Sequence, residues 1–181
     1  MTKIVGIVNI TPDSFSSDGL LNDVDTVKDQ ITTFIKDGVE IIDVGAESTR
    51  PGAILLSHQE EWQRFEKILD FIAENIAKTE FSIDTRHAQT ILKFINEIKP
   101  ENIKNLIIND VSGATDSELI EIAKEYNIKI ILTHSLTIPA DPEITIPEDA
   151  DAVEVVTNWI KNLVKKHYLS LIHISEPTRP Y

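Results

Sequence analysis

Two segments carry residue types suited to binding a diphosphate through a metal ion. In each, a short apolar run leads into a polar loop: residues 6–19 read GIVNITPDSFSSDG, and residues 43–52 read DVGAESTRPG. The first loop offers an amide oxygen and hydroxyls, and the second adds further hydroxyls and a guanidinium. Mg²⁺ accepts side-chain oxygens together with phosphates, and a guanidinium pairs closely with phosphate. Loops of this kind can also close over a substrate and exclude water.

Five apolar, β-branched runs recur along the chain and predict strands. They are residues 3–9, 40–45, 80–85, 106–111 and 129–134. The segments between them have the apolar spacing of helices, so the chain alternates strand and helix in five βα units. Strict alternation of this kind is typical of a parallel sheet covered by helices.

Local signals mark several helix boundaries. Gly38 suits the position just after the first helix, and Pro100 stops the third. Ser57–Glu60 and Thr115–Glu118 both have the spacing of a capping box, at the start of the second and fourth helices. A fifth helix is expected at about residues 151–168.

Polar residues stand at or just past the carboxyl end of each predicted strand. They are Asn9, Glu47, Asp84, Asn109 and His134. In a (β/α)₈ barrel these ends converge on one mouth, where the active site is built. A doubly wound sheet would also alternate, but this placement favours the barrel. Five units are too few for a closed barrel, so the sequence predicts an α/β protein with part of a (β/α)₈ TIM-type barrel.

Composition narrows the class of protein. The 181 residues carry a net charge of −13 and no cysteine, which argues against a nucleic-acid binder, a disulfide framework and a thiolate nucleophile. No long apolar run is present, and the first residues lack the layout of a cleavable signal. We therefore expect a cytoplasmic protein with no membrane and no nucleic-acid partner.

Both loop segments resemble the two signature motifs of dihydropteroate synthases, and the spacing between them fits that family as well. Residues 81–85 (FSIDT) and 107–110 (IIND) resemble the family's third and fourth strand ends. The resemblance covers about residues 3–168, taken as the N-terminal part of a pterin-binding barrel (domain 1–168). It implies an enzyme of folate biosynthesis that joins 6-hydroxymethyl-7,8-dihydropterin diphosphate to para-aminobenzoate and releases diphosphate.

The resemblance implies a role for each motif residue. Asn9 would be the protein ligand of Mg²⁺ on the pterin diphosphate. Thr49 would hydrogen-bond the diphosphate, and Arg50 would position the reacting groups. Asp84 would accept from the pterin ring N–H and exocyclic amine, and Asn109 would meet another pterin edge.

The two loops would supply further contacts. Phe15 and Pro51 would wall the aminobenzoate ring in a pocket that would also admit sulfonamides, and Asp13 and Asp18 would organise the first loop over the diphosphate. Because diphosphate departs early in this family, catalysis would rest on electrostatic stabilisation and positioning.

Each role has a structural alternative. Asp84 could cap the following helix, Asn109 next to Asp110 could serve a turn, and Arg50 could be a solvent-facing charge. Asn9 also begins a glycosylation sequon, which we set aside because the chain has no secretory signal. His134 is left out of the site, since a packed or surface histidine is at least as common as a ligand.

The chain departs from the family pattern in several places. An extra Ser17 separates Phe15 from Asp18, Leu20 replaces a glycine, and Ala46 stands where glycine is common. The family's sixth-strand Asp, its Lys from a Ser-Arg-Lys-like loop and its final Arg-x-His have no counterpart here. The chain alone is therefore expected to be inactive, and a full-length family member to be a homodimer.

Residues 169–181 do not continue the sequence pattern of the preceding chain. They resemble the conceptual translation of a transposon adapter used in sequencing libraries, so we expect the natural reading frame to continue differently; a natural frayed tail is the alternative.

Two other functions were weighed. One is another pterin-binding barrel such as a methyltetrahydrofolate methyltransferase, which binds no diphosphate and lacks these loop motifs. The other is an inactive binding module built on a partial barrel, whose open sheet edge would invite aggregation.

Overall fold

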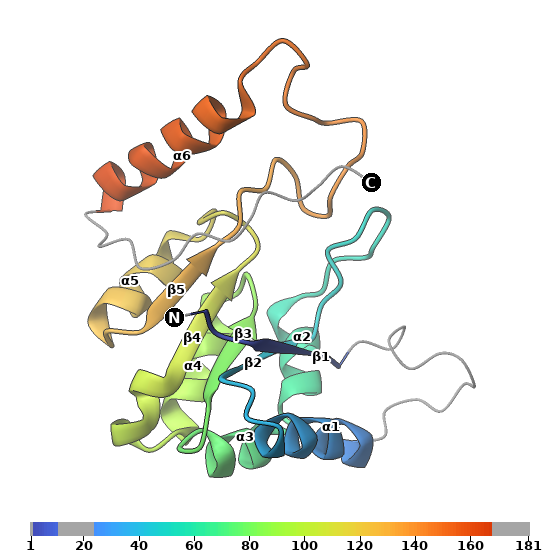
Figure 1. Ribbon diagram of the computed structural model, residues 1–181, viewed down its shortest axis with the longest axis vertical. Coiled ribbons are helices and arrows are strands. Elements are labelled where there is room, and N and C mark those ends of the chain that lie inside the picture. Colours follow the sequence, from blue (N-terminus) through green and yellow to red (C-terminus); the bar gives the residue numbers. More distant parts are fainter. Residues whose placement is uncertain (1, 11–23, 168–181) are drawn as a thin grey trace.

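Helical segments separate consecutive strands, as the sequence predicts, but the single helix expected after the second strand is divided into two. The computed structural model describes residues 2–10 and 24–167. The elements follow in the order β1 (Val5–Asn9), α1 (Val24–Lys36), β2 (Ile41–Gly45), α2 (His58–Phe65), α3 (Leu69–Asn75), β3 (Glu80–Asp84), α4 (Ala88–Glu97), the 3₁₀ helix η2 (Pro100–Asn105), β4 (Leu106–Asp110), α5 (Ser117–Glu125), β5 (Lys129–Leu132) and α6 (Ala152–His167) (Figure 1).

The strands form one parallel sheet in strict sequence order. Its order is β1-β2-β3-β4-β5, with every neighbouring pair parallel. A doubly wound sheet would reverse direction at a switch point, whereas a (β/α)₈ barrel adds each strand beside the last. The order therefore confirms an α/β fold of the TIM-barrel type with five βα units.

The two faces of the sheet have different neighbours. On β1, Gly6 and Val8 are buried, while Val5, Ile7 and Asn9 are exposed. A Cβ atom on Gly6 would lie 2.6 Å from the ring of Phe34, so helix α1 approaches this strand more closely than any side chain would allow. The buried face is thus the helix face, and the alternate residues belong to the barrel interior.

An ion-pair network lies near the amino ends of the strands. Glu80 of β3 pairs with Lys3, just before β1, and with Lys129 of β5. Barrel interiors are filled by layers of side chains from alternate strands, and these three residues come from the first, third and fifth.

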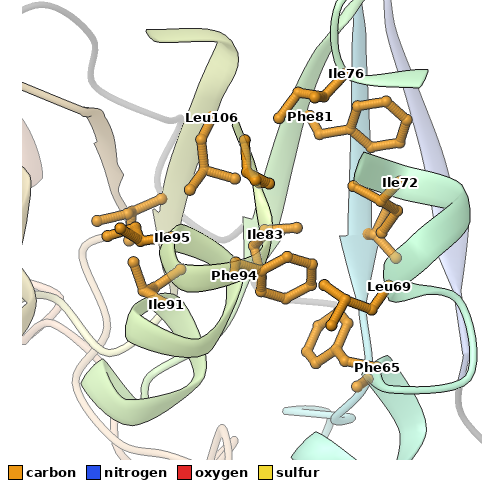
Figure 2. Close-up of a cluster of buried hydrophobic side chains, with 14 of the residues drawn as sticks. Phe65, Leu69, Ile72, Ile76, Phe81, Ile83, Ile91, Phe94, Ile95 and Leu106 are labelled. Carbon is orange, nitrogen blue, oxygen red and sulfur yellow. The ribbon is translucent and has the colours of Figure 1, made fainter. Parts of the chain in front are cut away.

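The main core lies between the sheet and helices α1 to α5, and its largest aromatic contacts come from α2 and α4. Figure 2 shows Phe65, Ile72 and Phe94 from these helices among side chains of the strands. The rings of Phe65 and Phe94 meet edge to face with centroids 5.3 Å apart, and Trp62 meets Phe94 at 5.7 Å. This packing fixes α2 against α4, and so fixes the starts of both helices beside the ends of β2 and β3.

Three of the predicted boundaries are confirmed and one is wrong. Helix α4 ends at Glu97, before Pro100. Ser57 and Glu60 form the predicted capping box, and Gly38 has a φ of +77° after α1. The capping box predicted at Thr115 is absent from the described structure, because Asp116 caps α5 instead and accepts from the N–H of Glu118. The hydroxyl of Thr115 is engaged with Ser112 in the preceding turn, at 2.7 Å.

The last helix packs on the edge of the sheet. Trp159 and Leu163 of α6 contact a small cluster of buried side chains from α5, β5 and the turn before α5. Across the described residues, no helix has the length and apolarity needed to cross a membrane.

Candidate active site at the strand ends

Four residues at the carboxyl ends of the strands stand in one row across the sheet. The backbone register pairs Asn9 with Gly45, Gly45 with Asp84, and Asp84 with Asn109. A Cβ atom on Gly45 would lie 3.2 Å from Oδ2 of Asp84 and 3.6 Å from Oδ1 of Asn9. The predicted polar residues of β1 and β3 therefore flank one open position above a glycine.

Asn109 reaches a carboxylate that the sequence analysis did not select. Its Nδ2 donates to Oδ1 of Asp43 at 3.1 Å. Asp43 lies two residues before Gly45 on β2, on the same face of the strand. Burial raises the pKa of Asp43, and the hydrogen bond from Asn109 acts in the opposite direction. This contact fixes the orientation of the Asn109 amide, and the alternation along β2 is the signal that could have identified Asp43.

The electrostatics of Asp84 set it apart from an ordinary surface carboxylate. Burial raises the pKa of Asp84 well above its usual range, and four neighbouring carboxylates, Asp43 foremost, raise it further. A carboxyl group in such surroundings gains more than usual from a donor or cation that binds beside it. Asp84 is thus suited to hold a ligand with paired N–H donors.

Helix capping and turn formation were the alternative roles for Asp84 and Asn109, and the neighbouring residues make the hydrogen bonds at these positions. The hydroxyl of Thr85 accepts from the N–H of His87 at the start of α4, at 3.0 Å. After β4, Asp110 accepts from the N–H groups of Ser112 and Ala114, at 2.8 and 2.6 Å. The turns that follow β3 and β4 are therefore organised by Thr85 and Asp110.

Thr49, Arg50 and Pro51 lie in the loop between β2 and α2. Arg50 and Pro51 are exposed, and the N–H of Ala53 donates to the carbonyl of Arg50 at 3.0 Å. Pro51 and Gly52 occupy the centre of this turn, and Gly52 has a φ of +78°. Proline followed by glycine is typical of a type II turn. The carbonyl of Thr49 accepts from the N–H of Ala140 at 3.0 Å, so the loop also touches the segment after β5.

The predictions for Asp13, Phe15 and Asp18 fall on residues 11–23, outside the described residues. His134 is 9% exposed, and its ring packs edge to face on Trp159 with centroids 5.0 Å apart. It is a packed histidine, in agreement with its exclusion from the predicted site.

A polar cluster behind the strand ends was missed from the sequence. Glu61 of α2 is fully buried, and its Oε2 accepts from the hydroxyls of Thr85, at 2.8 Å, and Thr90. Its Oε1 has no hydrogen-bond partner within residues 2–10 and 24–167. Burial raises the pKa of Glu61 to about 7, although both hydroxyls oppose the shift. Beside it, Arg86 pairs with Glu47.

Oxygen donors suited to a hard cation are present at the row. Asn9 offers an exposed amide oxygen at the end of β1, on the side of Gly45 opposite to Asp84. Mg²⁺ commonly takes one or two protein oxygens and completes its shell with water and phosphate. The donor type and exposure of Asn9 therefore fit the predicted role.

Comparisons with known proteins agree with this fold. The chain matches the family described as "Pterin binding enzyme" over residues 5–170. The dihydropteroate synthase of Clostridium beijerinckii is 40% identical over 135 residues, which are 74% of this chain and 48% of that protein.

Two solved structures share the fold. The dihydropteroate synthase of Anaplasma phagocytophilum with bound 6-hydroxymethylpterin-monophosphate has a TM-score of 0.74 at 30% identity, over 92% of this chain and 60% of that one. The Yersinia pestis enzyme with a sulfonamide drug complex has a TM-score of 0.75 at 26% identity, over 92% and 57%. The chain thus spans about half to three fifths of these relatives. With the family match over most of its length, the chain belongs to the pterin-binding enzyme family.

Proposed function

We propose that this chain is part of a dihydropteroate synthase, which condenses 6-hydroxymethyl-7,8-dihydropterin diphosphate with para-aminobenzoate and releases diphosphate. The observation that carries the proposal is the row of Asn9, Gly45, Asp84 and Asn109 at the strand ends. Its glycine keeps a side chain out of the space between the amide of Asn9 and the carboxylate of Asp84. Several relatives that match the chain bear this name; one solved structure contains 6-hydroxymethylpterin-monophosphate, and another is a sulfonamide drug complex.

Each residue of the proposed site binds a different part of the substrates. Asp84 accepts two N–H donors of the pterin, and Asn109, oriented by Asp43, meets another edge. Asn9 would hold Mg²⁺, and the bound cation would supply positive charge beside the diphosphate. Thr49 and Arg50 approach that diphosphate from the β2–α2 loop, and Pro51 lines the aminobenzoate pocket.

The reaction exchanges one bond for another. The aminobenzoate nitrogen bonds to the pterin methylene carbon, the carbon–oxygen bond to diphosphate breaks, and the nitrogen gives up a proton. Positive charge develops on the pterin as the bond to diphosphate weakens, and the carboxylate of Asp84 stabilises that charge from the ring edge. We assign Asp13, Phe15 and Asp18 of the first loop to the same site. We also propose that the protein is cytoplasmic and that the full-length protein is a homodimer.

Calorimetry with the pterin diphosphate tests this function. We expect binding to strengthen at least about tenfold when Mg²⁺ is added, because a cation held by the amide oxygen of Asn9 would offset the negative charge of the phosphates. In the variant Asn9→Ala most of this metal dependence should disappear, while the pterin without diphosphate should bind as before. Binding that ignores the metal would contradict the proposal and favour a pterin enzyme that uses no diphosphate.

Gly45→Ala tests where the pterin lies. The added methyl group would stand 3.2 Å from the Asp84 carboxylate, in the space assigned to the ring. Overpacking of this kind costs about 1–3 kcal/mol, so pterin affinity should fall about tenfold or more. Calorimetry gives the affinity, and thermal unfolding controls for the fold. A folded variant with unchanged affinity would place the pterin elsewhere.

A further inference from the structure

The loop between β2 and α2 is closed by bonds between its two ends. Glu47 begins it and Leu56 ends it, and the N–H of Leu56 donates to Oε1 of Glu47, nine residues away. We call residues 47–56 the 47–56 loop. Thr49 and Arg50 lie within it, so whatever fixes its ends also limits where these two residues can go.

Arg86 bonds to both ends of the 47–56 loop. Its Nε donates to Oε2 of Glu47 at 2.8 Å, and its Nη2 lies 3.2 Å from Oε1. The same Nη2 donates to the carbonyl of Leu56 at 2.7 Å. That carbonyl also lies 3.2 Å from Nε2 of His87. One guanidinium therefore bridges the first and last residues of the loop.

Burial makes this bridge more effective than a surface ion pair. The Glu47 side chain is 5% exposed and that of Arg86 is 22% exposed. Exposed ion pairs are screened by water and contribute little to stability. A shielded, bidentate arginine–carboxylate pair holds a defined geometry. Loss of either partner would leave the other with an unmet charge.

The bridge also ties the loop to the ligand site. Arg86 follows Asp84 by two residues, directly after β3, so it stands beside the strand end that presents the carboxylate to the pterin. We propose that Arg86 is a positioning residue that holds the 47–56 loop, and with it Thr49 and Arg50, over the diphosphate. This inference rests on the proposed function.

A divalent cation is a poorer interpretation of the same cluster. Glu47, Glu61 and His87 offer ligand atoms within 4.8 Å of one another. Both oxygens of Glu47 already accept from Arg86, however, and the guanidinium charge opposes a second cation at that position.

Hydrogen exchange and ligand binding by the full chain test the role of Arg86. In Arg86→Gln we expect the amides of Ala53 and Leu56 to exchange at least about tenfold faster, because the loop ends are released. With Mg²⁺ present, affinity for the pterin diphosphate should fall about tenfold, while affinity for the pterin without diphosphate stays within about twofold. Arg86→Lys, which keeps the charge but not the planar fork, should recover only part of the loss.

Arg64→Gln is the matched control. Arg64 donates to the carbonyl of Ala46 at 2.6 Å, one residue before the loop. The substitution therefore removes a nearby arginine but leaves the bonds between Glu47, Leu56 and Arg86 in place. Equal exchange in Arg86→Gln and the parent chain, or an equal increase in Arg64→Gln, overturns the inference. Faster exchange with unchanged diphosphate affinity also overturns it. If the parent chain binds neither pterin, the proposed function fails, and the exchange rates still decide whether Arg86 holds the loop.

Discussion

Replacing Asp84 by asparagine is expected to weaken pterin binding roughly a hundredfold. A carboxylate that accepts two N–H donors makes charge-assisted hydrogen bonds, each contributing about 1.5–3 kcal/mol. Asparagine keeps one acceptor oxygen but turns an NH₂ group toward a donor of the ligand, so one bond is lost and one contact becomes repulsive. A loss of about 3 kcal/mol corresponds to about a hundredfold in the dissociation constant, which calorimetry with the pterin measures directly.

Asp70→Asn is the control for this change. Asp70 is exposed on α3, and its replacement should leave pterin affinity within about twofold. Equal effects of the two substitutions would remove Asp84 from the ligand site and leave it a structural role at the end of β3.

The pH dependence of binding gives a second measurement on Asp84. Burial and neighbouring carboxylates raise the pKa of Asp84, so its ionised form is lost at a higher pH than in an ordinary aspartate. Pterin affinity should therefore fall on acidification through that raised pKa, and the fall should begin above the pH range of an exposed aspartate. In Asp84→Asn this part of the profile should be flat. A parent profile as flat as that of the variant would contradict the assignment.

The strand-end residues could be predicted because parallel strands impose their placement. Once the alternation of strands and helices was established, the carboxyl ends had to lie along one edge of the sheet. The register then places Asn9, Gly45, Asp84 and Asn109 in one row. Local sequence was sufficient to bring Asn9, Asp84 and Asn109 to this edge, because each is placed by its own strand. The other two polar residues predicted at the strand ends lie elsewhere: Glu47 pairs with Arg86, and His134 packs on Trp159.

Arg86 and Glu61 could not be predicted in this way. Arg86 and Glu47 are 39 residues apart, and Glu61 meets Thr90 across 29 residues, so both contacts depend on tertiary structure. That of Glu61 depends on how α2 packs against α4. In the sequence, Glu61 belongs to a run of polar residues at the start of a helix and has the spacing of a solvated face. Only the packing of Trp62 and Phe65 on Phe94 turns it inward.

The N-cap residue of α5 could not be predicted for the same reason. Thr115 and Asp116 are both good helix caps, and the choice between them depends on whether the Thr115 hydroxyl is free. It is engaged with Ser112, which in turn depends on the tight turn that Asp110 organises after β4. A choice between adjacent candidates was therefore decided by a neighbouring turn.

Glu61→Gln is expected to stabilise the folded chain at alkaline pH and to have little effect at acidic pH. Burial raises the pKa of Glu61 from 4.5 to about 7, so the folded state binds this proton more tightly than the unfolded chain does. The associated stability is fully present below pH 4.5 and is lost as the pH rises through about 7. A shift of this size corresponds to about 3 kcal/mol. Glutamine keeps an acceptor for Thr85 and Thr90 and carries no charge at any pH.

Denaturant unfolding of the parent and the variant, at about pH 4.5 and pH 8.5, measures this effect. The free energy of unfolding of Glu61→Gln should exceed that of the parent by up to about 3 kcal/mol at the higher pH and match it at the lower one. Glu74→Gln, on the exposed side of α3, should show no such dependence on pH. A difference between variant and parent that is the same at both pH values would mean that folding does not shift the pKa of Glu61. The raised pKa of Glu61 would then be refuted, since a folded state that penalises the charge must gain when the charge is removed.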